Sequence, residues 1–170
     1  VLLVGGETEK VRNNDVNFDF RQDSIFWYLT GIEEADALMM MLKKDSEKYI
    51  LFLQEKKIEE EVWTGYKIGN EKAKSFYLAN DSYKNDETER YIEILLSCEK
   101  IYYNLGSSDK VDKLIIKGLE QFKKIKSRIG IPNPMIIDPS VLIDRMRLKK
   151  SNEEINILQK AIDITSNGFR

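Results

Sequence analysis

The sequence predicts an α/β fold, a mixed β-sheet flanked by helices, on three observations. Short apolar runs bounded by turn residues come first, apolar residues at helical spacing follow them, and strand-like and helix-like segments then alternate. Apolar runs too short for a stable helix indicate buried strands, and apolar residues three or four positions apart indicate amphipathic helices. Strands that alternate with helices are typical of an α/β domain.

The first 53 residues are expected to form a meander of strands. Residues 25–30 are aromatic and β-branched and end at Gly31, so they predict a strand antiparallel to the next apolar run. The polar stretch 7–17 is expected to be a loop, and charged residues at 43–48 are typical of a hairpin connection. The expected strands are residues 1–4, 25–30, 37–42 and 49–53.

Helical spacing dominates after residue 53. Ser108 or Asp109 can cap a long helix with a continuous apolar face, and Asp138 with Pro139 is expected to start another. Residues before proline avoid helical backbone angles, so the segment 131–134 is predicted to be extended. The expected helices are 71–78, 87–98 and 108–126, and the expected strands are 101–105 and 135–137.

The last helix opens with a capping box, in which Ser151 and Glu154 satisfy two backbone N–H groups reciprocally. Its apolar stripe needs a partner surface, so we expect it to be the first element of a second domain. The predicted organisation is therefore residues 1–148 as one domain and residues 149–170 as a linker with the first helix of the next.

Composition excludes several functions. Lys and Arg number 27 and Asp and Glu number 29, a net charge of −2 with interleaved signs, so nucleic-acid binding is not expected. No apolar run approaches the roughly 20 residues of a membrane span, and no targeting segment is visible. A lone cysteine, Cys98, agrees with a reducing compartment such as the cytoplasm and is expected to be a buried, inert thiol. With no histidine, the chain offers no Ser-His or Cys-His pair and no imidazole ligand.

A polar cluster precedes the aromatic segment in Phe20-Arg21-Gln22-Asp23-Ser24. The aromatic side chains that follow are expected to be core, because each large apolar side chain contributes about 1.5–3 kcal/mol when buried. Arg21 and Asp23 predict either a turn or a partly buried ion pair.

Three further segments allow two interpretations each. Trp63, beside Gly65 and after Glu59-Glu60-Glu61, is either core or an exposed anchor for a partner or ligand, and we favour the anchor. The three consecutive glutamates point in different directions on a helix, so they indicate a solvated face rather than a metal site. Arg128 ends a basic run that suits a helix C-terminus, but it can also reach a carboxylate on a ligand or neighbouring subunit. The glycines do not have the spacing of a phosphate-binding loop.

Taken together, several of these segments resemble the N-terminal domain of aminopeptidase P, a member of the creatinase and prolidase-like family. The resemblance covers almost the whole chain and depends on the order and separation of the segments. They are Arg12-Asn13-Asn14-Asp15, Phe20-Arg21-Gln22-Asp23-Ser24, Phe26-Trp27-Tyr28-Leu29-Thr30-Gly31, Glu61-Val62-Trp63-Thr64-Gly65, and Arg147-Leu148-Lys149-Lys150-Ser151 with Glu153-Glu154-Ile155.

The resemblance implies part of an Xaa-Pro metallo-aminopeptidase, a hydrolase that releases the N-terminal residue from peptides with proline second. In that family two divalent ions, typically Mn²⁺, are held by aspartates, a histidine and glutamates of a C-terminal "pita-bread" domain. The resemblance thus implies that catalytic residues, metal ligands and cofactor lie outside this chain, and that residues 149–170 lead into that domain. The fragment alone is expected to be non-catalytic.

The resemblance also implies a creatinase-like unit with ribonuclease-H-like topology, which forms a homo-oligomer, a dimer or tetramer, and narrows access to the active site. Trp63 matches a family tryptophan near the active site of a neighbouring subunit. Asp15 follows an Arg-Asn pair at the same entrance, and Arg128 occupies a position similar to an entrance arginine. These three residues are the candidates for the substrate entrance or subunit interface.

Two other functions stay open from the sequence. A non-enzymatic protein-binding module would keep this domain without a working metal site, and a full-length protein with intact ligands but no release from X-Pro peptides would favour it. A prolidase, which cleaves X-Pro dipeptides, is the nearest enzymatic rival, and longer peptide substrates discriminate between the two.

Overall fold

The computed structural model describes residues 1–43, 46–57, 59, 61, 65–88, 92–130 and 132–169, with the side chains of all these except residues 93 and 125–129. The chain divides into two compact units, Val1–Asp138 and Pro139–Arg170. The first unit contains the sheet and the predicted entrance residues. The second contains two helices and is described by itself below.

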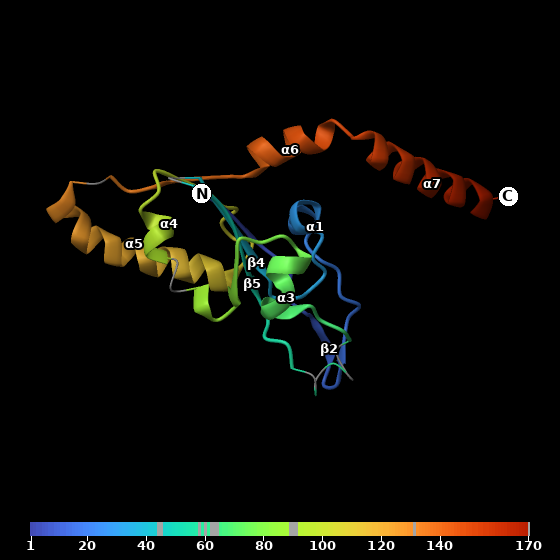
Figure 1. Cartoon of the computed structure of the whole chain (residues 1–170), viewed down its shortest axis with the longest axis horizontal. Coiled ribbons are helices and arrows are strands. Elements are labelled where there is room, and N and C mark those ends of the chain that lie inside the picture. Colours follow the sequence, from blue (N-terminus) through green and yellow to red (C-terminus); the bar gives the residue numbers. More distant parts are fainter. Residues whose placement is uncertain are drawn as a thin grey trace. The chain divides into compact units, whose positions relative to one another are not determined.

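The first unit is an α/β structure, as predicted, and its elements are coloured along the sequence in Figure 1. Its strands are β1 (Leu2–Gly5), β2 (Val11–Asn13), β3 (Val16–Asn17), β4 (Leu38–Lys43), β5 (Glu47–Leu53), β6 (Asp81–Lys84), β7 (Lys100–Tyr102) and β8 (Met135–Ile137). Its helices are α1 (Ser24–Thr30), α3 (Gly69–Phe76), α4 (Ile92–Leu96) and α5 (Asp109–Ile129).

The main sheet is mixed, which confirms the predicted fold class. In the described residues six strands pair in the order β6-β5-β4-β1-β7-β8, and β2 pairs separately with β3. Strand β4 is antiparallel to both β1 and β5, whereas the pairs β1–β7, β5–β6 and β7–β8 are parallel. All strands of this sheet except β4 therefore end at the same edge, which we call the carboxyl edge.

Alternate side chains of the central strands fill two separate cores. Met40 and Phe52 face one core, which also contains Leu95 of α4 and Ile115 of α5. Met39 and Leu51 face the other, which contains side chains of α1 and α3. Figure 1 accordingly shows α4 and α5 on one side of β4 and β5, with α1 and α3 on the other. Because both faces are covered, the central strands are nearly continuous apolar runs.

Residues 24–30 form a helix, so the strand predicted for 25–30 is wrong. Asp23 is the N-cap of α1, and its Oδ1 accepts hydrogen bonds from the backbone N–H groups of Ile25 (2.9 Å) and Phe26 (2.8 Å). Gly31 ends the helix in the left-handed region at φ 67°. Two caps eight residues apart therefore override the β-propensity of the aromatic residues. Phe26 is fully buried, but Trp27 is 52% exposed, so the prediction that all these aromatics are core is also wrong.

The Asp23 cap leads to a first testable prediction. Changing Asp23→Ala removes the acceptor of two backbone N–H groups and is expected to lower the free energy of unfolding by about 1 kcal/mol. Chemical denaturation followed by circular dichroism measures this change. The exposed Asp19 lies four residues earlier, so Asp19→Ala is the matched control, and an equal loss in both variants would contradict the capping role.

Other expected elements are largely confirmed. The 37–42 and 49–53 strands form the predicted antiparallel hairpin, and the long helix and the 135–137 strand are present. The 7–17 segment, expected to be a loop, contains β2 and β3, and β6 was not predicted. Cys98 is only partly buried, contrary to expectation.

The second unit consists of α6 (Ser140–Leu148) and α7 (Asn152–Gly168). The N-cap of α6 is Pro139, without a side-chain cap, rather than the expected Asp138. The predicted capping box is present, because Ser151 Oγ accepts from the Glu154 N–H (3.2 Å) and Glu154 Oε2 accepts from the Ser151 N–H (2.7 Å). The predicted apolar stripe of α7 is exposed, with Ile162 at 59%. The predicted boundary at residues 148/149 stays a prediction.

Candidate functional site

The candidate site is the group of loops at the carboxyl edge. In sheets with parallel strands, ligands are commonly bound at this edge, because the loops that follow the strands converge there. Two long connections leave it, which we call the first loop (residues 6–23, after β1) and the second loop (residues 54–68, after β5). The connection from α1 to β4, residues 31–37, enters the sheet at the same edge and contacts both loops. We call residues 31–37 the crossing connection.

Gln22 fixes the first loop to the crossing connection. Its Nε2 donates to the backbone oxygens of Ile32 (3.2 Å) and Glu34 (2.9 Å). Its Oε1 accepts from the backbone N–H groups of Glu7 (2.6 Å) and Asp23 (3.0 Å). Each of these bonds ties the amide to a different backbone group, and the residue is only 8% exposed. The amide of Gln22 therefore sets the geometry of the loop and the start of α1.

Gly6 leaves the space that this amide occupies. A Cβ atom at position 6 would lie 2.9 Å from Gln22 Oε1 and 3.1 Å from the Ala37 carbonyl oxygen. Real side chains do not approach backbone oxygens so closely without a shift of one partner. The glycine after β1 is therefore required by packing, which explains one of the two adjacent glycines in the sequence.

A surface cleft of about 340 Å³ lies over this loop. It is lined by residues 7, 8, 10 and 18–24, so it follows the polar cluster recognised in the sequence. Lys10 forms an ion pair with Glu7 (3.5 Å) at its margin, and Arg21 is exposed to solvent. The alternatives for Arg21 and Asp23 are resolved in part, since Asp23 forms the helix cap described above.

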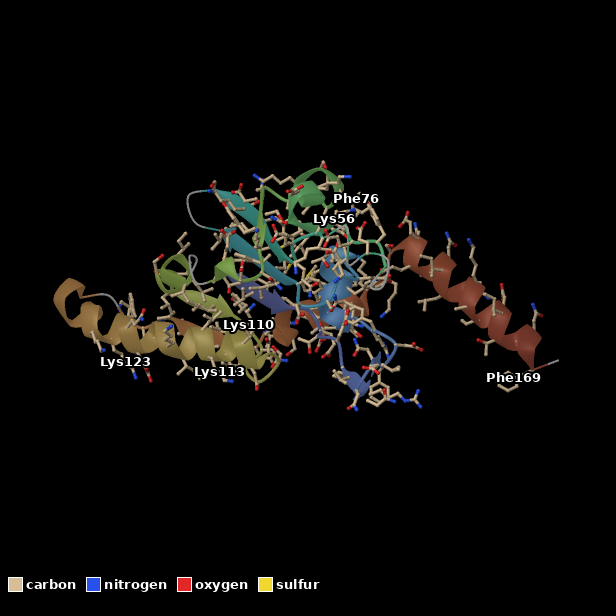
Figure 2. The ribbon with its side chains drawn as sticks, turned by 90° about the horizontal axis from the view of Figure 1, so that it is seen from below. Lys56, Phe76, Lys110, Lys113, Lys123 and Phe169 are labelled. Carbon is tan, nitrogen blue, oxygen red and sulfur yellow. The ribbon has the colours of Figure 1, made fainter. Side chains whose placement is uncertain are left out.

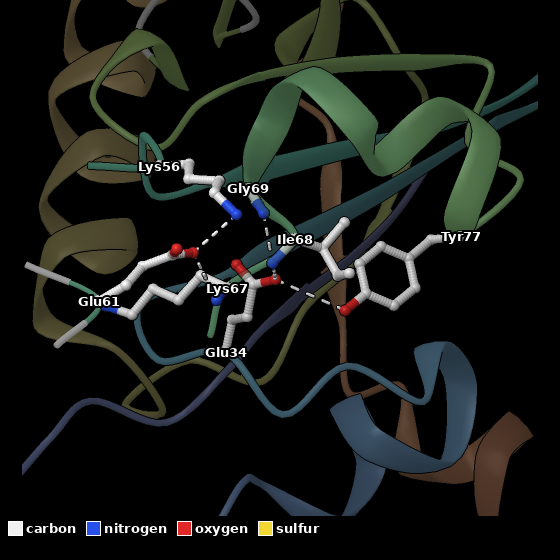
Figure 3. A network of polar contacts seen from close by, with 7 residues as sticks. All are labelled: Glu34, Lys56, Glu61, Lys67, Ile68, Gly69 and Tyr77. Atoms are coloured by element: carbon white, nitrogen blue, oxygen red, sulfur yellow. Dashed lines mark hydrogen bonds and ion pairs between the residues drawn. The ribbon is translucent and has the colours of Figure 1, made fainter. Parts of the chain in front are cut away.

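Glu34 holds the second loop. Its Oε1 accepts from the backbone N–H groups of Ile68 (2.9 Å) and Gly69 (3.3 Å), and from the Tyr77 hydroxyl (3.5 Å). Figure 3 shows this carboxylate at the centre of the polar network, with its partners on two sides. The residue is 8% exposed, although carboxylates are seldom buried without full pairing. Burial, followed by the neighbouring Glu34 carboxylate, raises the pKa of Tyr77 to about 12.

The ends of segment 56–69 lie against each other. A Cβ atom at Gly69 would lie 2.8 Å from Lys56 Cβ, and Gly69 has φ 68°, so only glycine fits there. Lys56 Nζ pairs with Glu61 Oε1 at 2.7 Å, and Lys56 Nζ also lies 4.0 Å from the centroid of the Tyr66 ring. The Glu61 carboxylate raises the pKa of Lys56, and the Lys56 ammonium lowers that of Glu61. The two described ends of the segment are therefore in contact.

Asp36, in the crossing connection, forms hydrogen bonds with both loops. Its N–H donates to the Glu7 carbonyl (3.0 Å), and its Oδ2 accepts from Gln54 Nε2 (2.9 Å). Gln54 Oε1 in turn accepts from Lys67 Nζ (2.7 Å). Asp36 has φ 55°, a conformation that is uncommon for residues other than glycine and asparagine. The crossing connection is thus bound to both loops through Glu34 and Asp36.

The structure places the predicted entrance residues as follows. Asp15 is exposed in the turn between β2 and β3, at the tip of the first loop. Trp63 lies outside the described residues. Arg128 lies in α5, but its side chain is outside the described set. The three residues therefore stay candidates, and the described geometry does not bring them together.

Sequence reasoning missed Glu34 and Asp36 entirely and did not assign a role to Gln22. Gln22, directly before the Asp23 N-cap, and Glu34, three residues after Gly31, belong to no periodic pattern. The only local signal is their position beside helix caps and strand ends. Their roles depend on backbone groups that are distant in the sequence; Gly69, whose N–H donates to Glu34, lies 35 residues further along the chain.

The described residues do not fit a metal site. Within them no three Asp, Glu or Cys side chains gather in a way that could hold a metal ion. We therefore assign no metal ligand among these residues. None of the helices in the described part of the chain is long and apolar enough to cross a membrane.

Comparison with known proteins shows the family. The family described as "Aminopeptidase P, N-terminal domain" matches residues 1–102, more than half of the chain. The chain belongs to this family. An Xaa-Pro aminopeptidase of Haemophilus influenzae is 34% identical over 169 residues, which are 98% of this chain and 37% of that protein. The Escherichia coli Xaa-Pro aminopeptidase is 29% identical over 168 residues, covering 96% of this chain and 38% of that protein.

Solved structures of the aminopeptidase P family agree with this assignment. Zinc-substituted E. coli aminopeptidase P in complex with product superposes with a TM-score of 0.86 at 28% identity, covering 96% of this chain and 38% of that chain. Proline aminopeptidase P II of Yersinia pestis gives 0.85 at 28% identity, with the same coverage. The chain thus spans well under half the length of the relatives that it matches.

Proposed function

We propose that this chain is the N-terminal domain of an Xaa-Pro metallo-aminopeptidase, in which it shapes the substrate entrance and contributes to a homo-oligomer. The observation that carries the proposal is the match along nearly the whole chain to Xaa-Pro aminopeptidases of two bacteria. The parent enzyme would release the N-terminal residue from peptides with proline in second position. The structure of a relative with bound zinc supports metal chemistry in that enzyme.

The geometry of the carboxyl edge supports an entrance role. Loops 6–23 and 54–68 are long, yet Gln22, Glu34 and Asp36 fix both of them to one crossing connection. An exopeptidase has to hold one chain terminus and exclude folded polypeptide, and rigid loops from a second domain can form the wall of such a pocket. Asp15 and Trp63 belong to these two loops, and we propose that both face the entrance.

The metals of the parent enzyme belong, in this proposal, to a C-terminal domain beyond this chain. Two divalent ions, with Mn²⁺ proposed, would polarise the scissile carbonyl and activate water there. In this proposal the residues of this chain bind no metal; they help to position the substrate and to exclude folded polypeptide. We also propose a cytoplasmic enzyme, on the basis of the single unpaired cysteine.

Trp63 provides the test of the entrance role. In the full-length polypeptide with the metal-binding domain, Trp63→Ala is expected to raise KM for a tripeptide with proline second roughly tenfold, because lost aromatic anchors cost about 1–2 kcal/mol or more. The turnover number is expected to change little, since the contact is made equally in ground and transition states. Steady-state kinetics of proline-peptide release measures both.

Trp27 is the matched control. It is the other tryptophan of the chain, it is 52% exposed on α1, and we assign it no entrance role. Trp27→Ala is expected to leave KM within about twofold of the unmodified enzyme. An unchanged KM in Trp63→Ala would contradict the entrance role. Hydrolysis restricted to X-Pro dipeptides would instead identify the parent as a prolidase.

A further inference from the structure

The start of α3 has no cap of its own. Its N-cap residue is Ile68, whose side chain cannot accept a hydrogen bond. The first N–H groups of any helix have no partner within the helix, and they carry a partial positive charge. At α3 two of these groups, the N–H of Ile68 and of Gly69, donate to Glu34, which lies more than 30 residues earlier in the chain. The cap of this helix is therefore a tertiary contact and not a local one.

The carboxylate of Glu34 is more than a stabilising contact. Its Oε2 is buried and has no hydrogen-bond partner in the described part of the chain. Burying a carboxylate oxygen without a partner is unfavourable, so this arrangement lowers the free energy of unfolding relative to a fully paired carboxylate. A buried charge with a few directional bonds does, however, fix the orientation of the groups around it. Figure 3 shows the carboxylate between the Lys56–Glu61 pair and the Tyr77 ring.

Glu34 also connects the two loops of the carboxyl edge. Its main-chain oxygen accepts from Gln22 Nε2 in the first loop (2.9 Å), and its carboxylate holds Ile68 and Gly69 at the end of the second. The contact of Gly69 with Lys56 then fixes the beginning of segment 56–69 to its end. Glu34 therefore holds the end of a segment whose beginning packs against that same end.

We propose that Glu34 is the positioning residue of the entrance, which sets the placement of segment 65–69 relative to the crossing connection and to the first loop. The structural part of this inference stands on the described contacts. Its effect on substrate binding rests on the proposed function. Glu34 itself is not expected to touch substrate, because it is 8% exposed and its bonds are directed at the backbone.

The test begins with the 170-residue chain and does not require activity. Trypsin cleaves after Lys67, and the bond that it cuts carries the N–H of Ile68 that Glu34 holds. Hydrogen bonds to charged groups contribute enough that Glu34→Ala is expected to raise the cleavage rate after Lys67 about tenfold, if cleavage follows the population of released loop. Mass spectrometry of the early fragments measures the rate at each site.

Two controls separate release of the loop from general unfolding. Cleavage after Lys113, which is exposed on α5 (Figure 2), is expected to stay within about twofold in the same digest. Glu33→Ala removes the adjacent exposed carboxylate and is expected to leave both rates unchanged. Equal acceleration at Lys67 and Lys113, or equal effects of Glu33→Ala and Glu34→Ala at Lys67, would overturn the proposal.

Glu34→Gln keeps the test decisive if the alanine variant does not fold. The amide oxygen can still accept from Ile68 and Gly69, so the cleavage rate after Lys67 is expected to lie between those of the unmodified chain and of a chain without an acceptor. Amide hydrogen exchange at Ile68 and Gly69 is the second measurement. Exchange at these two amides that is already unprotected in the unmodified chain would show that the carboxylate does not position the segment.

Kinetics of the full-length polypeptide then separate this inference from the proposed function. Glu34→Ala is expected to raise KM for a proline tripeptide several-fold, about as Trp63→Ala does, with little change in turnover number, and Glu34→Gln is expected to restore part of the loss. Release of the loop with an unchanged KM would refute the entrance role and leave the positioning role intact. An unchanged loop would refute the positioning role, whatever the kinetics.

Discussion

Changing Gln22→Ala is expected to lower the free energy of unfolding by about 3 kcal/mol or more, because it leaves several buried backbone groups without their partner. The two donors and one oxygen of this amide serve four backbone groups, of Glu7, Asp23, Ile32 and Glu34. Each unsatisfied buried group costs about 1–3 kcal/mol, and water that enters the space recovers part of this. Urea denaturation measures the change.

The matched control for this variant is Gln121→Ala. Gln121 is exposed on α5, where alanine is at least as good a helix former, so stability is expected to change by less than about 0.5 kcal/mol. The two variants remove the same chemical group from different surroundings. Comparable losses in both would show that the four contacts of Gln22 contribute nothing beyond those of a surface amide.

Stability is expected to fall as the pH rises from 10 to 12. Burial raises the pKa of Tyr49 and of Tyr77 to about 12, from 10 in the unfolded chain, with a further contribution from Glu34 at Tyr77. Between these values the unfolded state has released protons that the folded state retains, so the free energy of unfolding decreases with pH. Burial also raises the pKa of Tyr103, which acts in the same direction.

The size of this effect follows from the two shifts. One pKa unit corresponds to 1.36 kcal/mol, so Tyr49 and Tyr77, shifted by about two units each, together contribute at most about 5 kcal/mol. Both rings are only partly buried, and solvent reduces the figure to roughly 2 kcal/mol. Guanidinium denaturation at a series of pH values measures it.

Tyr77→Phe is the variant that assigns the pH effect. It removes the titrating hydroxyl and keeps the ring, so its stability is expected to fall less steeply between pH 10 and 12. A slope identical to that of the unmodified chain would exclude Tyr77 as a contributor. A flat profile in the unmodified chain would contradict the raised pKa of both tyrosines.

The elements that the sequence predicted correctly have signals confined to a few neighbouring residues. The β4–β5 hairpin shows two apolar runs around a charged turn, and α7 begins with its own capping box at Ser151 and Glu154. For α1 the aromatic composition of residues 25–30 predicted a strand. The caps at Asp23 and Gly31 were present in the sequence, and they decide the structure because they satisfy backbone groups at both helix ends.

The candidate site was less predictable than the fold, for a physical reason. Gln22 and Glu34 bond to backbone atoms, which every residue has, so no particular partner type marks their roles in the sequence. Glu34 caps a helix that begins at Gly69, a pairing that exists only after the sheet has formed. The assignments of Asp15, Trp63 and Arg128 came from the family resemblance and stay predictions.

The strand pairs of the mixed sheet differ in how much chain they close, which affects the order in which we expect them to form. Strands β4 and β5 are close neighbours in the sequence, so their pairing closes a short stretch of chain and can form early. Strand β1 pairs with β7 through Leu2 and Tyr102, and the Tyr102 N–H donates to the Val1 carbonyl oxygen (2.8 Å). That pairing closes about a hundred residues of chain, so more chain entropy is lost before the contacts between the two strands can compensate for it. We therefore expect the β4–β5 hairpin to form before β1 pairs with β7.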